Sequence, residues 1–294
     1  MLLLFSYINI GFKSTMTVIG IHMSSDKLHG SWYISGTPQP YSVESIRDCI
    51  CITEDGVSFG EEAWERRQQY PGNTIYDFRN LLSFCPDTVE STNLHYPFQL
   101  VVVDGHFLVP IWLNGAHWLH PVEELFGRLL EKLRKRIEEK LVFPITRAIL
   151  AVPSEYFGKM RINSLKRAVE LGGLQTVSVI SENHARVIYR VQRINCTGEK
   201  NVVVFEVDPA RSNVSILSYS NGTVRSLLNQ ETTQFSEESM NRRLAEFCIK
   251  EYTRKHGIKP TNEEAIYQQC ANAAAKFVDK TFTVKVEPGK TIQI

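Results

Sequence analysis

Apolar residues recur with a helical period across residues 122–141, and this pattern constrains the fold more than any other feature of the sequence. The apolar positions are Val122, Leu125, Phe126, Leu129, Leu130, Leu133, Ile137 and Leu141. Because this spacing puts them on one side of a 3.6-residue helix, the segment predicts an amphipathic helix with a buried face. Pro121 precedes it and fits the first turn of a helix, where a missing N–H costs little.

The Lys and Arg residues between positions 132 and 140 are interleaved with acids, which predicts a solvated helix face. The chain of 294 residues carries 33 Lys and Arg against 32 Asp and Glu. A surface that follows phosphates needs a basic excess, so this balance gives no argument for nucleic acid as a partner. No run approaches the ~18–20 apolar residues that cross a bilayer, so we expect no stable membrane span.

Strand and helix patterns alternate along the whole chain. Strands are expected at residues 18–21, 30–37, 46–53, 100–103, 108–113, 147–152, 176–180, 201–207 and 214–219. Helices are expected from residue 59 onward and at 122–141, 157–171, 182–192, 237–256 and 262–278. A polar break at 195–200 separates two halves, so the fold class is α/β with two lobes, at 16–194 and 195–294.

Residues 1–15 make a poor signal peptide. No positive charge precedes the apolar stretch of residues 1–10, Lys13 follows it, and no small-residue cleavage site is evident. We interpret residues 1–15 as an N-terminal extension or a weak signal-like segment, with translation from Met16 as one alternative. The expected compartment is the cytoplasm, or the endoplasmic reticulum if residues 1–15 act as a signal.

The six cysteines are too sparse for a disulfide scaffold in a chain of this size. Cys49 and Cys51 have the wrong spacing for a CxxC pair, and no His follows at zinc-ligand distance. We interpret all of them as ordinary thiols and expect no metal site.

Several short motifs, in one order and at similar spacings, resemble the nucleotide-binding domain of the heat shock protein 70 family. They are VIGI at 18–21, FGEEA at 59–63, NTIYD at 73–77, YPF at 96–98, AVPSEY at 151–156 followed by Arg161, LGGL at 171–174, VISE at 179–182, NVSIL at 213–217 and the segment 238–242. The resemblance covers about residues 16–282. Within the family, we take the divergent microsomal stress-70 type as a neighbour.

The resemblance implies a two-lobed, actin-like ATPase fold that holds ATP or ADP with magnesium between its lobes. It also implies a role in protein folding or the stress response, with co-chaperones or unfolded client proteins as partners. The family's domain continues past residue 294, so the resemblance implies that the second lobe is incomplete here and that the peptide-binding domain is absent.

The first phosphate loop of the family corresponds to residues 22–26. His22 replaces an aspartate that helps to hold the water shell of the metal, Ser24 replaces a glycine, and Ser25 keeps a hydroxyl in place of a threonine. A phosphate loop needs glycines because its backbone must approach the anion and aim N–H groups at it. The exchange therefore weakens the expected phosphate site.

The second phosphate loop corresponds to residues 206–213, where Asp208, Pro209 and Ala210 replace glycines. Pro209 has no N–H to donate, and Asp208 repels a triphosphate. Each charge-assisted hydrogen bond to phosphate is worth about 1.5–3 kcal/mol, so losing several lowers affinity by orders of magnitude. We therefore expect little or no ATP hydrolysis.

The resemblance assigns functional positions in three groups. The catalytic-type positions are Arg79, in place of the family's catalytic lysine, Glu182, which matches a glutamate that organises the metal and its water, and Glu206. The cofactor-binding positions are Ser24, Ser25, Arg211, Glu238 and Lys276. The interlobe relay positions are Pro153 and Arg161.

Structural alternatives stand beside these roles. Glu182 heads a predicted helix, where acids favour the dipole. Arg79 is an ordinary surface cation in the simpler interpretation, and His22 is a hydrogen-bonded residue at a strand end rather than a metal ligand with Asp26 and His29.

Three functions remain open from the sequence. The first is a chaperone-type or partner-binding scaffold with degenerate phosphate loops. The second is a weak Mg-ATPase that uses Arg79, Glu182 and Glu206, and the third is a non-functional gene fragment. Intact apolar periods favour the first over the third.

Overall fold

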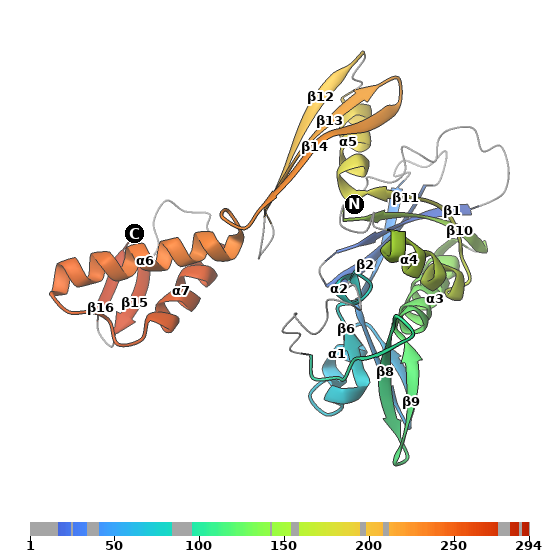
Figure 1. Cartoon of the computed structure of the whole chain (residues 1–294), viewed down its shortest axis with the longest axis horizontal. Coiled ribbons are helices and arrows are strands. Elements are labelled where there is room, and N and C mark those ends of the chain that lie inside the picture. Colours follow the sequence, from blue (N-terminus) through green and yellow to red (C-terminus); the bar gives the residue numbers. More distant parts are fainter. Residues whose placement is uncertain are drawn as a thin grey trace. The chain divides into compact units, whose positions relative to one another are not determined.

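The computed structural model describes residues 17–24, 26–33, 41–83, 96–141, 143–153, 159–194, 198–207, 212–275, 283–287 and 290–293. Contacts divide the chain into two compact units, residues 1–198 and 199–294 (Figure 1). Among the described residues, no helix has both the length and the apolar character that crossing a membrane requires.

A five-stranded sheet forms the centre of the first unit, in the order β11-β10-β1-β2-β3. Its strands are β1 (Thr17–Met23), β2 (Lys27–Tyr33), β3 (Tyr41–Arg47), β10 (Ile145–Val152) and β11 (Gln175–Ser181). β1, β10 and β11 are parallel, whereas β2 and β3 continue the sheet in antiparallel order. The carboxyl ends of the three parallel strands therefore lie at one edge of the sheet.

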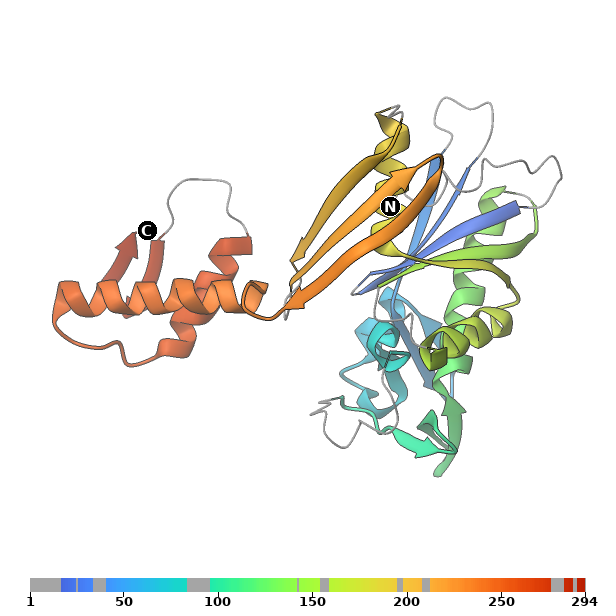
Figure 2. The same cartoon turned by 45° about the horizontal axis from the view of Figure 1, so that its top comes forward.

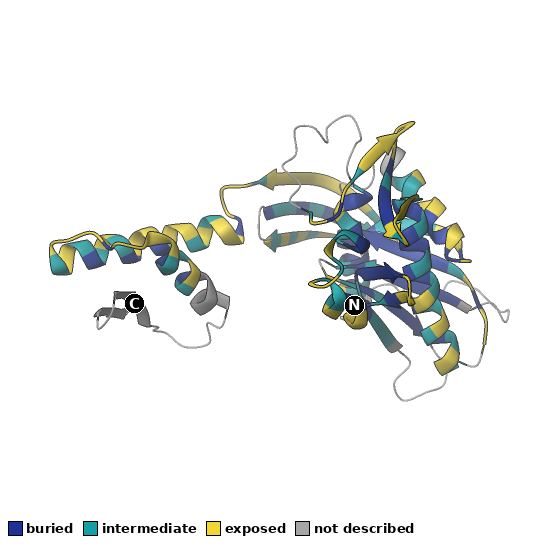
Figure 3. Ribbon diagram, turned by 90° about the horizontal axis from the view of Figure 1, so that it is seen from below, coloured by how far each residue is buried: buried dark blue, intermediate teal, exposed yellow. Residues whose placement is uncertain are grey.

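Three helices follow the pattern predicted for the first unit: α3 (Val122–Leu141), α4 (Lys159–Leu171) and α5 (Glu182–Arg193). The apolar face of α3 is buried as expected, in one core cluster with strands β1 and β10. Gly127 of α3 lies so close to α4 that a Cβ there would be 3.0 Å from the carbonyl oxygen of Ala168. Figure 3 shows the buried residues concentrated in the strands and helices of this unit.

Two small sheets complete the first unit. One has the order β5-β4-β6 and the other β7-β8-β9. Their strands are β4 (Cys49–Thr53), β5 (Gly56–Phe59), β6 (Thr74–Tyr76), β7 (Val101–Val103), β8 (His106–Leu113) and β9 (Ala116–Pro121). The short helices between them are α1 (Glu61–Arg66), η2 (Pro71–Asn73) and α2 (Phe78–Leu81).

The side chain of Asn73 joins these two sheets. Its Nδ2 donates to the carbonyl oxygens of Ile52 in β4 and Trp112 in β8, at 3.0 and 2.7 Å. Its Oδ1 accepts from the N–H of Trp112 at 3.1 Å. One buried amide thus satisfies backbone groups of both sheets.

The prediction of one strand over residues 46–53 is wrong. The segment belongs to two strands in different sheets, β3 and β4, which are separated at Asp48. The N–H of Asp48 donates to the carbonyl oxygen of Asp26 at 2.8 Å, and its Oδ2 accepts from the N–H of Phe78 at 2.9 Å. These partners are distant in sequence, so an apolar alternation cannot reveal the break.

The second unit begins with an antiparallel sheet in the order β12-β13-β14. Its strands are β12 (Lys200–Val207), β13 (Ser212–Ser220) and β14 (Thr223–Thr232), and Figure 2 shows them as a meander. The predicted turn at Asn221 and Gly222 is confirmed, with φ values of +48° and +80°. β9 and β14 have no counterpart among the predicted strands, because most of their residues are exposed and show no apolar alternation.

The rest of the second unit contains α6 (Glu237–His256), α7 (Glu263–Ala275), β15 (Thr283–Glu287) and β16 (Lys290–Gln293). α6 has the predicted bounds, because Ser236 accepts the N–H of Ser239 at its start and Gly257, with φ +71°, ends it. The predicted helix 262–278 is α7, and its last three positions lie outside the described residues. The sequence did not predict β15 and β16.

Candidate functional site

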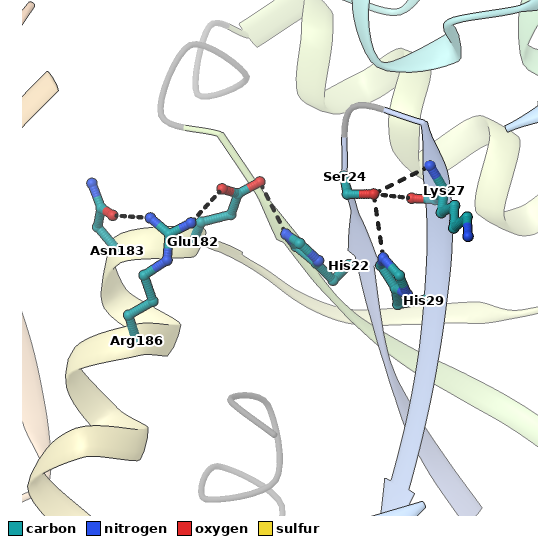
Figure 4. A network of polar contacts seen from close by, with 7 residues as sticks. All are labelled: His22, Ser24, Lys27, His29, Glu182, Asn183 and Arg186. Carbon is teal, nitrogen blue, oxygen red and sulfur yellow. Dashed lines mark hydrogen bonds and ion pairs between the residues drawn. The ribbon is translucent and has the colours of Figure 1, made fainter. Parts of the chain in front are cut away.

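The side chains of His22 and Glu182 meet at the carboxyl edge of the central sheet. His22 lies near the end of β1, and Glu182 is the first residue after β11. Nε2 of His22 lies 3.3 Å from Oε1 of Glu182 (Figure 4). The two atoms lie within ion-pair distance, although Oε1 does not meet full hydrogen-bond geometry.

Positive groups surround the buried carboxylate of Glu182. Nη2 of Arg186 donates to its Oε2 at 3.4 Å, and Nη1 of the same guanidinium donates to Oδ1 of Asn183 at 3.0 Å. Burial raises the pKa of Glu182, but the contact with His22 and the charges of His22, Arg79 and Arg186 outweigh burial and leave the pKa below its ordinary value. The structure therefore brings two predicted catalytic residues, Arg79 of α2 and Glu182, into electrostatic range.

Ser24 closes the turn between β1 and β2 with both of its polar groups. Its N–H and its hydroxyl each lie 2.9 Å from the carbonyl oxygen of Lys27, and its Oγ accepts the N–H of Lys27 at 3.2 Å. Nε2 of His29 lies 3.2 Å from the same Oγ. In this turn the N–H of Ser24 donates to the protein's own backbone.

The imidazoles of His22 and His29 stack beside this turn, with ring centroids 5.7 Å apart (Figure 4). Nδ1 of His29 lies 2.7 Å from Oγ of Ser45, so each ring nitrogen of His29 has a serine hydroxyl as its hydrogen-bond partner. Burial and the charge of His22 lower the pKa of His29. Within the described residues, no group of three or more His, Cys, Asp or Glu side chains is arranged to hold a metal ion.

The other predicted site residues lie elsewhere or outside the described residues. Pro153 is buried and follows β10, and Arg161 lies in α4. Glu206 lies in β12, and Glu238 lies in the first turn of α6, so both belong to the second unit, whereas Glu182 belongs to the first. Positions outside the described residues are Ser25, Asp208, Pro209, Ala210, Arg211 and Lys276.

Sequence reasoning missed Asp48 and Arg186. Asp48 is buried, and burial together with the charge of Asp77 raises its pKa to about 7, against the lowering effect of the Phe78 and Arg79 N–H groups. An acid inside an otherwise apolar alternation was the available signal for Asp48. Arg186 stands one helical turn after Glu182, and this spacing was the signal for their pairing.

The comparisons with known proteins agree with the motifs. The model of the family described as Hsp70 protein matches residues 41–284. Heat shock 70 kDa protein 13 of Bos taurus is 27% identical over 263 residues, which cover 86% of this chain and 55% of that protein. Putative heat shock 70 kDa protein 7 of Homo sapiens is 28% identical over 211 residues, which cover 71% of this chain and 57% of that protein.

The chain spans about half the length of the curated relatives it matches. The family match nevertheless includes strands, helices and the Glu182 position in the first unit and continues through α6 and α7 in the second. Because this match extends over most of the sequence, the chain belongs to the Hsp70 family.

Proposed function

We propose that this chain is an Hsp70-type nucleotide-binding domain that hydrolyses little or no ATP and acts in protein folding as a partner-binding scaffold. Its partners would be co-chaperones or unfolded client proteins, and its two units would be the lobes of an actin-like fold. The cytoplasm is the proposed compartment, with the endoplasmic reticulum as the alternative. The observation that supports the loss of activity most directly is the closed turn at Ser24.

A phosphate bound at this turn would need N–H groups that point outward. Ser24 instead donates its N–H and its hydroxyl hydrogen to the carbonyl oxygen of Lys27. A glycine at this position would lack the hydroxyl, which would leave room beside the backbone for an anion. Opening the turn for a phosphate would break these bonds. As placed, Ser24 therefore offers neither its N–H nor its hydroxyl hydrogen to a phosphate.

The contact between His22 and Glu182 argues against magnesium at the same place. Mg²⁺ selects oxygen ligands and keeps several waters, which carboxylates orient. Here the carboxylate of Glu182 contacts an imidazole and a guanidinium, and a protonated His22 would repel a cation. The residues at this edge therefore do not fit a magnesium-bound triphosphate, and we derive no catalytic step through one.

One observation favours the second candidate, a weak Mg-ATPase. Arg79 acts electrostatically on Glu182, so two residues expected at the family's catalytic positions are within range of each other. If nucleotide binds with an opened turn, Arg79 would supply a fixed positive charge near the phosphates. Glu182 would then have to exchange its contact with His22 for water.

Thermal melts of the full chain with millimolar Mg-ADP and Mg-ATP test the proposal. A ligand that binds only the folded state adds RT ln(1 + [L]/Kd) to stability. We expect no shift of the midpoint for the natural sequence. A repaired variant that combines His22→Asp, Ser24→Gly, Asp208→Gly, Pro209→Gly and Ala210→Gly should regain a shift that depends on magnesium.

The natural sequence decides between the two candidates in the same experiment. A midpoint that rises with Mg-ATP, together with hydrolysis above that of an Arg79→Ala, Glu182→Ala double variant, would establish the weak ATPase and overturn our proposal. The scaffold role is tested by capture of purified co-chaperones without nucleotide, and binding no stronger than that of an unrelated α/β protein would reject it.

A further inference from the structure

Two thiols face each other in the core between α6 and α7. Sγ of Cys248 in α6 lies 3.3 Å from Sγ of Cys270 in α7, and both residues are fully buried. The two helices run side by side in the second unit (Figure 1). Neither cysteine is among the residues assigned to nucleotide, so the pair is independent of the function proposed above.

We propose that Cys248 and Cys270 form a disulfide bond that locks α6 to α7. A disulfide requires a sulfur–sulfur distance of about 2.05 Å, so the two sulfurs must approach each other by roughly 1.3 Å. Rotation of the two side chains together with a slight closing of the helices would bring the sulfurs to that distance. The two thiols are within hydrogen-bond distance, closer than the roughly 3.5–4.0 Å of an ordinary apolar contact.

The small size of this core gives the bond a structural purpose. The α6–α7 cluster contains only five buried residues among those described, namely Ala245, Cys248, Tyr252, Ile266 and Cys270. A core of this size supplies little stability by burial alone, and small cores are commonly supported by disulfides. Closing the loop between positions 248 and 270 should shift the folded-to-unfolded ratio by on the order of a hundredfold.

A lasting bond requires an oxidising compartment, so this inference goes with the endoplasmic reticulum, the alternative compartment named above. The oxidant there is a small-molecule disulfide such as glutathione disulfide. A thiolate of one cysteine attacks it, which forms a mixed disulfide and releases one glutathione thiolate. The thiolate of the second cysteine then attacks the protein sulfur and releases the other glutathione. In total the protein loses two electrons and two protons, and one glutathione disulfide becomes two glutathione molecules.

The reaction should occur while the helices assemble. Burial and the hydrogen bond with Cys270 raise the pKa of Cys248 to about 12, and burial raises the pKa of Cys270. Few thiolates therefore exist in the packed core, and a bulky disulfide cannot reach them. We expect rapid pairing during refolding and slow pairing in the folded chain.

The pair Cys49 and Cys51 provides an internal comparison. Both are buried in β4, but residues two apart in a strand place their Cβ atoms about 6.6 Å from each other. A disulfide needs Cβ atoms about 3.5–4.5 Å apart. Burial alone therefore does not predict a bond, and we expect these two thiols to stay reduced.

Disulfide mapping of the full chain tests the proposal. The reduced chain is refolded in mixtures of reduced and oxidised glutathione, quenched with acid, alkylated, digested and analysed by mass spectrometry. We expect a linked peptide that joins Cys248 to Cys270. In urea unfolding, the folded-to-unfolded ratio of the oxidised protein should be higher than that of the reduced protein by on the order of a hundredfold. The stability of the variants Cys248→Ala and Cys270→Ala should not change on oxidation.

Three results would overturn the inference. They are two free thiols at every glutathione ratio, preferred pairing of either cysteine with a different one, and a linked peptide without any gain in stability. If the chain does not refold, the same mapping on natively purified protein left with glutathione disulfide for days gives the answer. There, slow appearance of the 248–270 link supports the bond, and its absence rejects it.

Discussion

His22 at the end of β1 contacts Glu182 at the start of α5, with Nε2 and Oε1 3.3 Å apart. β10 lies between the two strands that lead to these residues, so the contact crosses a neighbouring strand at the carboxyl edge of the sheet. The contact gives the buried carboxylate of Glu182 a polar partner. The family resemblance expects an acid next to a metal at this position. The same pair stabilises the fold and, under the function proposed above, disfavours magnesium.

Replacement of His22 by alanine should destabilise the protein by about 1–3 kcal/mol at pH 7, because Glu182 stays buried and loses a partner. The pKa of Glu182 should rise as a result. Its pKa is lowered in the folded state, so its stabilising contribution exists above the ordinary value of 4.5 and is lost as the pH falls through the lowered value. Urea unfolding from pH 7 to pH 3 should show the two curves converging in acid.

His22→Gln is the matched control for this prediction, because its amide keeps a donor without a charge. We expect it to lose less stability than His22→Ala at pH 7. Equal losses for both variants, or a loss that does not depend on pH, would show that packing of the imidazole and not the pair with Glu182 is responsible.

Replacement of Asp48 by asparagine should remove a pH dependence of stability. Burial, with the charge of Asp77, raises the pKa of Asp48 from its ordinary value of 3.8 to about 7. A carboxyl whose pKa is raised on folding contributes stability below the unfolded pKa, and this contribution is lost as the pH rises through the folded pKa. The natural chain should therefore lose stability from pH 4 to pH 8, and Asp48→Asn should lose less.

Asp48→Asn keeps an oxygen that accepts the N–H of Phe78. At pH 8 it should be more stable than the natural chain by about 1–3 kcal/mol. The exposed Asp55 provides the control, and Asp55→Asn should leave the pH profile unchanged. Parallel profiles for Asp48→Asn and the natural chain between pH 4 and pH 8 would contradict a raised pKa.

The parts of the fold that depend on local periodicity could be predicted from the sequence. α3 begins and ends where the apolar period of residues 122–141 does, because burial of a long face decides the structure of such a segment. The strand break at Asp48 could not be predicted, since its cause is an N–H of Phe78 that only the folded chain brings near. β9 was missed because it pairs with β8 through its backbone while its side chains are mostly exposed.

In the candidate site too, some features could be predicted from the sequence and others depend on the folded chain. The family motifs indicated Arg79 and Glu182, and in the structure the charge of Arg79 acts on Glu182. That His22 contacts Glu182 depends on the order and register of three parallel strands, which no motif specifies. The closed turn at Ser24 likewise depends on the hairpin geometry, whereas the sequence indicated only the loss of a glycine.

Gly127→Ala should destabilise the packing of α3 against α4. A Cβ at this position would lie 2.8 Å from Cβ of Leu171 and 3.0 Å from the carbonyl oxygen of Ala168. Alanine favours a helix by up to about 1 kcal/mol over glycine, but the overpacking costs about 1–3 kcal/mol. Urea unfolding should show a net loss, whereas Gly72→Ala, where a Cβ meets nothing within 4 Å, should be neutral.

A net gain for Gly127→Ala would mean that α4 moves away without cost, and it would contradict the close approach of the two helices. A loss at both positions would instead indicate a general effect of removing glycine. The comparison therefore separates packing from backbone preference.

Outside the apolar core of the first unit, substitution of Asn73 should be among the most destabilising changes. Asn73→Ala removes three hydrogen bonds and leaves backbone groups of Ile52 and Trp112 without this partner, so we expect a loss of about 2–4 kcal/mol in urea unfolding. Asn73→Asp keeps the acceptor for Trp112 but points a carboxylate at two carbonyl oxygens. Burial and these oxygens raise the pKa of the introduced acid, so Asn73→Asp should have low stability at pH 7. At pH 4 the carboxyl is protonated and donates one hydrogen bond again, so the variant should recover part of its stability. Recovery in acid for the aspartate variant and none for the alanine variant would identify the donated bonds as the cause, and equal behaviour of the two variants would assign the loss to side-chain volume instead.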